Sequence, residues 1–272
     1  MVRIALILLV CLATTVFVNH YIPLQAAVIA LYLGLGAMAV AAVSLVKPLR
    51  FLGIRRRAVA AVLLAIGVAV AIAAISWTAP MIHASGPHQR LDDFMASYSF
   101  YERHETRVKA TPQQVARAVR EVRFSDIPVA TLLMRIRGMA SGRFSAPPPS
   151  TRPILAVMSG PGSGFLVLDA GRPDEYVGGM VGRPWASGPP PHVATPEGFL
   201  AFSTPGYVKV AFNIRWVDEG NGYVRVSTET RCIGTDAESR KVFGRYWRVI
   251  YPGSAIIRRA WLDAIVTLAE GG

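Results

Sequence analysis

The stretch YVKVAFNIRWVDEGNGYVRVSTETRCI, residues 207–233, decides the fold of this chain. Two runs of alternating apolar and polar residues flank DEGNG, a loop rich in turn-forming residues, which is typical of a β-hairpin. Pairing the two arms about Gly220 places their apolar side chains on one face of the hairpin. The predicted pairs are Trp216 with Val224, Ile214 with Val226, Phe212 with Thr228, and Val208 with Cys232.

The opposite face of this hairpin carries mixed charges that suit contact with water. They are Lys209, Arg215, Arg225, Glu229 and Arg231. An antiparallel sheet with one apolar face needs another element to cover that face.

The C-terminal segment supplies a covering helix. Asp236 is a plausible helix N-cap, and Pro252 predicts a break that divides the segment into two helices. After the break, Ile257, Trp261 and Leu268 recur at helical spacing and form an apolar stripe. The sequence therefore predicts an α+β sandwich that closes with an amphipathic C-terminal helix.

The region before the hairpin adds further strands and helices. YERHETRVKA (101–110) alternates like a strand, and Thr111, Pro112 and Gln114 match the start of a helix with a capping box. A second short helix is expected from about residue 125. Strands are expected at 164–169 and 175–181. Most of the Gly/Pro/Ser-rich segment 138–164 is expected to be loop, and the Pro-rich segment 183–198 is expected to be a connection.

The N-terminal part of the chain has a different composition. The 272 residues are 52% hydrophobic and carry a net charge of +12, yet no acidic residue precedes Asp92. We expect a transmembrane region at 1–78, with three helices at about 4–20, 24–46 and 58–77. The first run could instead be a cleaved signal peptide. A juxtamembrane linker at 79–99 and a globular domain at 100–272 follow.

The basic segment KPLRFLGIRRR, residues 47–57, predicts the orientation in the membrane. Lys and Arg stay preferentially on the cytoplasmic side, so this loop is expected to be cytoplasmic. The chain is then a multi-pass protein of the cytoplasmic (inner) membrane. Its N-terminus is cytoplasmic and its C-terminal domain is extracytoplasmic.

The order of elements resembles a known superfamily. ETRVKATPQQVARAV (105–119) is similar to the strand-to-helix step of START-like, polyketide-cyclase-type (SRPBCC) helix-grip domains. The segment 229–262 is similar to the ending of many bacterial members. The resemblance covers about residues 100–270. The three-helix membrane anchor and the Pro-rich insertions depart from the pattern of the soluble members.

The resemblance implies a hydrophobic cavity between the sheet and the C-terminal helix, where such domains bind lipids or other apolar small molecules. It carries over no catalytic residue. The residues expected to line the cavity are Phe212, Thr228, Thr230, Tyr246 and Trp261.

Few residues point to other chemistry. Glu102 and His104 share one face of a strand and could form an acid–base or metal site, but a solvated strand face is the preferred interpretation. Cys232 is expected to be a buried, inert thiol. The aromatic and arginine residues of 245–261 are expected to pack in the core, with contact to the bilayer as the alternative.

The sequence favours a membrane-anchored domain that binds a hydrophobic or amphipathic, lipid-like molecule. Its expected partners are the bilayer and that ligand. No cofactor, metal or nucleic acid is expected, and no protein partner is predicted. One alternative is an envelope module with a filled core. A weaker alternative is a cyclase- or hydrolase-type enzyme, although no catalytic motif occurs.

Overall fold

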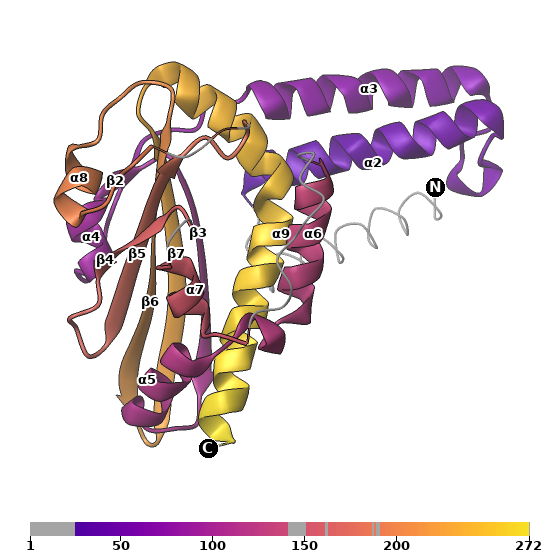
Figure 1. Cartoon of the computed structure of the whole chain (residues 1–272). Coiled ribbons are helices and arrows are strands. Elements are labelled where there is room, and N and C mark those ends of the chain that lie inside the picture. The colour runs from indigo at the N-terminus through magenta and orange to yellow at the C-terminus, as the bar shows by residue number, and fades with distance from the viewer. Residues whose placement is uncertain (1–24, 141–150, 161–162, 187, 189–190, 272) are drawn as a thin grey trace. The chain divides into compact units, whose positions relative to one another are not determined.

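The computed structural model describes residues 25–140, 151–160, 163–186, 188 and 191–271 (Figure 1). These residues divide into two compact units. Unit 1 comprises the described residues up to Thr78 together with Gly244–Pro252, and unit 2 comprises Ala79–Phe243 together with the residues from Gly253 onward.

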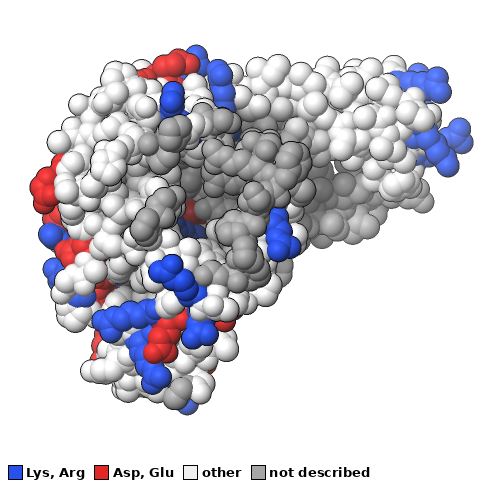
Figure 2. Space-filling model, in the orientation of Figure 1, with Lys and Arg blue, Asp and Glu red and all other residues white. Residues whose placement is uncertain are grey.

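Unit 1 contains a hairpin of two apolar helices, α2 (Ala26–Val46) and α3 (Arg57–Ser76), connected through the short helix η1 (Arg50–Leu52). Both are long and apolar enough to cross a membrane, which confirms two of the three predicted apolar helices. The run at 4–20 lies outside the described residues. On the face shown in Figure 2, basic side chains gather at the turn between α2 and α3.

Small residues allow the two helices to pack closely. A Cβ atom on Gly34 would lie 2.9 Å from the carbonyl oxygen of Gly67, so a larger residue at either position would force the backbones apart. Large apolar side chains such as Val62 and Ile72 remain 60% exposed on the hairpin surface. This pattern suits helices that are surrounded by lipid.

A segment of the C-terminal helix α9 (Ala237–Glu270) also belongs to unit 1. The Arg248 guanidinium donates to the carbonyl oxygens of Ile75, at 3.4 Å, and of Trp77. A cation near the end of α3 satisfies carbonyl groups that have no partner within the helix. Tyr32 of α2 donates to the carbonyl of Val249 at 2.9 Å.

Unit 2 is built on an antiparallel sheet with the strand order β3-β7-β6-β5-β4 (Figure 1). Two short strands form a separate sheet. The strands are β1 (Ile82–His83), β2 (Ser97–Tyr98), β3 (Phe100–Val108), β4 (Phe165–Asp169), β5 (Glu175–Gly182), β6 (Val208–Gly220) and β7 (Tyr223–Gly234). The helices are α4 (Arg90–Phe94), α5 (Pro112–Glu121), η2 (Phe124–Asp126), α6 (Pro128–Ala140), α7 (Ile154–Met158) and α8 (Pro196–Ala201).

The α+β class, the antiparallel sheet and the long C-terminal helix are confirmed. The capping box of Thr111 and Gln114 is present at the start of α5. Most of the segment 138–164 was expected to be loop, but it contains α7, whose Ile154 is buried in the core.

The β6–β7 hairpin differs from its predicted register by two residues. Phe212 pairs with Thr230, and Trp216 pairs with Val226. The turn consists of Asn221 and Gly222, both with positive φ (55° and 78°), as a two-residue hairpin turn requires. A shift of two residues preserves the side-chain faces, so the apolar face forms as predicted.

Helix α9 is continuous, so the predicted break at Pro252 is wrong. A proline inside a helix removes one backbone hydrogen bond. Buried residues on both sides, including Tyr251 and Trp261, hold the helix in place despite this loss. The predicted N-cap is confirmed, because the Asp236 carboxylate accepts from the Ser239 backbone N–H at 2.8 Å.

The second face of the sheet is also covered, in contrast to the prediction of a solvated face. Glu229 and Arg231 are buried, and Arg231 donates to Asp92 at 2.7 Å and to the carbonyl of Met95 at 2.8 Å. The covering residues lie within 79–99, the segment predicted to be a linker. Leu91 in α4 is fully buried there, so this segment is part of unit 2.

The N-cap of α9 predicts a pH dependence. Backbone N–H groups of Ser239 and Gly206 lower the pKa of Asp236 to about 2. The stabilisation from the ionised carboxylate is therefore present above the ordinary aspartate pKa and is lost as the pH falls through about 2. We expect Asp236→Asn to reduce the fall in Tm between about pH 4 and pH 2, as measured by circular dichroism. Parallel Tm curves for the variant and the unaltered chain would contradict this.

Candidate functional site

Unit 2 contains a central polar cluster between its sheet and α9, which consists of Glu102, His104, Thr228, Thr230 and Arg258. Strand alternation directs the β3 and β7 members to the same face, where Glu102 pairs with Thr230 and His104 pairs with Thr228. Glu102 and His104 are only 2% and 3% exposed. The predicted solvated strand face is therefore wrong at these two positions, because they lie on the face that α9 covers.

Helix α9 supplies the partners of the buried carboxylate. Glu102 Oε1 accepts from the Ser254 hydroxyl at 2.6 Å and lies 3.7 Å from Arg258 Nε. The Arg258 guanidinium also lies over the rings of Phe212 and Trp261, with 4.9 Å and 5.4 Å from Cζ to the ring centroids. Burial lowers the pKa of Arg258, and the neighbouring Glu102 opposes that shift.

Several polar atoms of this cluster lack a hydrogen-bond partner among the described residues. They are Glu102 Oε2, both ring nitrogens of His104 and the Thr230 hydroxyl. His104 Nε2 lies 3.7 Å from Glu102 Oε2. An unsatisfied buried polar group costs about 1–3 kcal/mol, so this cluster is a costly feature of the core.

Four of the five residues predicted to line a cavity lie at or beside the central polar cluster. Phe212 and Trp261 contact Arg258, Thr228 accepts from Arg258 at 3.4 Å, and Thr230 is buried beside Glu102. Tyr246 is half-buried and belongs to unit 1. Cys232 is buried as predicted, and its burial raises the pKa of the thiol well above the usual value.

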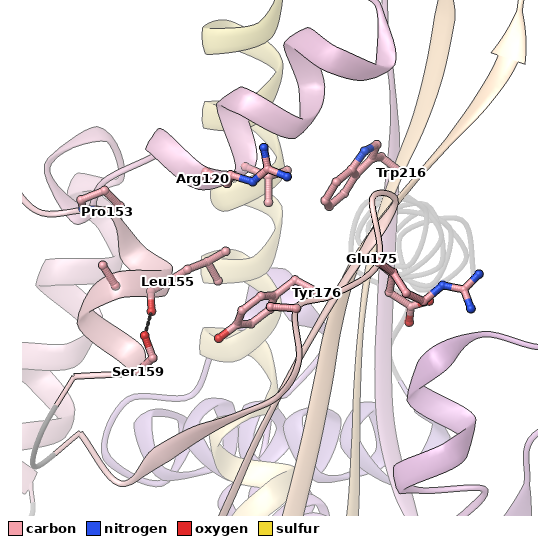
Figure 3. Close-up of a pocket in the computed structure, with 11 residues that line it drawn as sticks. Arg120, Pro153, Leu155, Ser159, Glu175, Tyr176 and Trp216 are labelled. Carbon is pink, nitrogen blue, oxygen red and sulfur yellow. Dashed lines mark hydrogen bonds between the residues drawn. The ribbon is translucent and has the colours of Figure 1, made fainter. Parts of the chain in front are cut away.

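A pocket of about 330 Å³ opens elsewhere in unit 2, between α5, α7, the β4–β5 connection and β6 (Figure 3). We call it the side pocket. Its apolar walls include Val119, Leu155, Tyr176 and Trp216. In Figure 3 the side chains of Leu155, Tyr176 and Trp216 surround a common space.

Two of the three charged residues that line the side pocket are arginines. Arg120 makes no side-chain hydrogen bond or ion pair with any residue that the structure describes, and Arg172 contacts Asp174 at 3.5 Å. Glu175 also lines the pocket, but its carboxylate accepts from Asn213 Nδ2 at 2.8 Å and from the Arg90 N–H at 2.9 Å. These hydrogen bonds hold the carboxylate in place.

The side pocket was not predicted from the sequence, and none of the five predicted cavity residues lines it. Its wall at α7 comes from a segment that was interpreted as a loop. The apolar run Ile154–Met158 was the available signal. Trp216 was predicted to lie on the apolar face of the hairpin, but it was not predicted to line a cavity.

No group of three or more His, Cys, Asp or Glu residues within the described part of the chain could hold a metal ion. Comparison of the chain with known protein families, with functionally described proteins and with solved structures finds no match.

The central polar cluster generates a prediction about stability. Arg258→Met leaves the buried Glu102 carboxylate without its cation, so we expect a loss of about 3–5 kcal/mol in the free energy of unfolding. Adding Glu102→Gln removes the uncompensated charge, so the double variant should be more stable than Arg258→Met alone. Denaturant unfolding of the full chain in detergent measures both. An Arg258→Met variant as stable as the unaltered chain would show that the ion pair does not matter.

Proposed function

We propose that this chain is a membrane-anchored domain that binds an amphipathic small molecule. The observation that carries the proposal is the side pocket, which combines aromatic walls with a cationic edge. Small-molecule sites in proteins are typically concave, mostly apolar, and about 300–1,000 Å³ in volume. The side pocket, at about 330 Å³, fits the lower end of that range.

The membrane anchor in this proposal is the α2–α3 hairpin. Its helices have 21 and 20 residues and expose large apolar side chains along their length. The basic turn between them favours a cytoplasmic location for that turn. The proposal therefore places unit 2 on the outer side of the cytoplasmic membrane, where a ligand can enter from the lipid or from the solvent.

The START-like helix-grip resemblance is part of the proposal. It is supported by the pairing of the first long strand with the last, β3 with β7, and by the long helix that ends the chain. Domains of that superfamily bind apolar molecules, which agrees with the aromatic walls of the side pocket.

A cyclase- or hydrolase-type enzyme is the second candidate. The observation that favours it is the buried Glu102–His104 pair, whose Glu102 Oε2 and His104 ring nitrogens have no hydrogen-bond partner in the part of the chain that the structure describes. The side pocket favours binding, because its lining contains neither of these two residues.

Filling the side pocket tests the proposed function. We expect Ala156→Trp to occupy the pocket and to abolish photolabelling of unit 2 by a diazirine-bearing alkyl amphiphile, measured on the full chain in lipid nanodiscs by peptide mass spectrometry. Gln113→Trp introduces the same side chain at an exposed position of α5 and should leave labelling unchanged. Equal labelling of both variants, or labelling confined to peptides outside the pocket, would contradict the proposal.

The orientation in the membrane has its own test. In intact cells, a membrane-impermeant maleimide should label Glu238→Cys, which is exposed at the start of α9, and should not label Leu52→Cys in the α2–α3 turn. The unaltered chain gives the background labelling. The opposite result would place unit 2 in the cytoplasm.

A further inference from the structure

We infer that the amphiphile of the side pocket carries an anionic headgroup, a carboxylate or a phosphate, that binds Arg120 at the edge of the apolar walls. This inference rests on the proposed function, because it specifies the ligand class of the same pocket. It is carried by the positions and the existing partners of the charged side chains that line the pocket.

Arg120 can bind an anion without giving up another side-chain contact to the described residues. Arg120 has no side-chain partner among the described residues, so a ligand would not have to displace one. Arg172 also lines the pocket, but its Nε contacts Asp174 at 3.5 Å, so the proposal rests on Arg120. Guanidinium groups bind carboxylate and phosphate with two parallel hydrogen bonds.

The acidic residue of the pocket, Glu175, is held on the other face of the sheet by its own hydrogen bonds. Glu175 is only 3% exposed, and it accepts from Asn213 and from the backbone N–H groups of Arg90 and Leu91. Those donors belong to the second face of the sheet and to α4. In Figure 3 the Glu175 side chain points away from Leu155 and Tyr176. Arg120 lies on the same side of the sheet as Leu155 and Tyr176.

The walls of the side pocket require an apolar tail on the ligand. Val119, Leu155, Ala156 and Trp216 present no charge. The Tyr176 ring adds a large apolar surface, and burial raises the pKa of the hydroxyl, which therefore remains a neutral hydrogen-bond donor at physiological pH. A free inorganic anion would leave these walls in contact with water, so we expect the headgroup and the tail to bind together.

The experiment compares molecules that differ only in the headgroup. Decanoate, decyl phosphate and decanol compete with the diazirine amphiphile for the full chain in nanodiscs at neutral pH, where the carboxylate is ionised. We expect at least one of the two anions to compete about tenfold more strongly than decanol, as a charge-assisted contact provides. Inorganic phosphate alone should not compete.

The arginine is tested by a matched pair of variants. Arg120→Gln should reduce competition by the preferred anion to the level seen with decanol. The same variant should leave competition by decanol itself unchanged. Arg117→Gln removes the same charge one turn earlier, from a residue paired with Glu121 at 3.0 Å, and should have no effect. Both arginines are exposed, so the Tm of each variant should match that of the unaltered chain.

The outcomes separate the two proposals. If decanol competes as strongly as both anions, or if Arg117→Gln matches Arg120→Gln, the anionic headgroup is excluded and the amphiphile site stands. If inorganic phosphate competes as strongly as decyl phosphate, the site binds free anions and the tail plays no part. If no amphiphile competes and the probe does not label the pocket, the proposed function itself fails.

Discussion

The packing of the last part of α9 against the sheet of unit 2 is the interaction on which the rest of this domain depends. Trp261, Leu262 and Ile265 are buried in one core cluster with Phe212 and Trp216 of β6. The same helix presents Ser254 and Arg258 to the buried Glu102 carboxylate. One element therefore buries the apolar face and supplies the partners of the charge enclosed beneath it.

The Phe212 ring and the side pocket lie at different places on the apolar face of the sheet. Phe212 lies against β5 only because Gly178 has no side chain, since a Cβ there would lie 2.5 Å from the Phe212 ring. The Arg258 guanidinium lies over this ring, with 4.9 Å from Cζ to the ring centroid, on the face where the resemblance places a cavity. The side pocket forms instead near the end of β6, where Tyr176 and Trp216 face α5 and α7. The ligand proposal therefore concerns the end of the sheet and not its centre.

Local patterns in the sequence predicted most of the secondary-structure elements of unit 2. Alternation identified β3 and the β6–β7 hairpin, and cap chemistry located the starts of α5 and α9, because these signals act within a few residues. The features that the sequence did not predict depend on packing between residues that are distant in the chain. The burial of Glu102 and Arg231 depends on α9 and α4, which are distant in the chain. The side pocket combines α5, α7 and β6, and no single segment carries its signature.

Native mass spectrometry of the full chain, with organic extraction of any molecule that co-purifies, tests the central claim most directly. The claim is that unit 2 holds an anionic amphiphile in the side pocket. It predicts a bound molecule with an apolar chain and a carboxylate or phosphate, present in the unaltered protein and absent from Ala156→Trp. A mass equal to the polypeptide alone, unchanged after incubation with a membrane lipid extract, would contradict it.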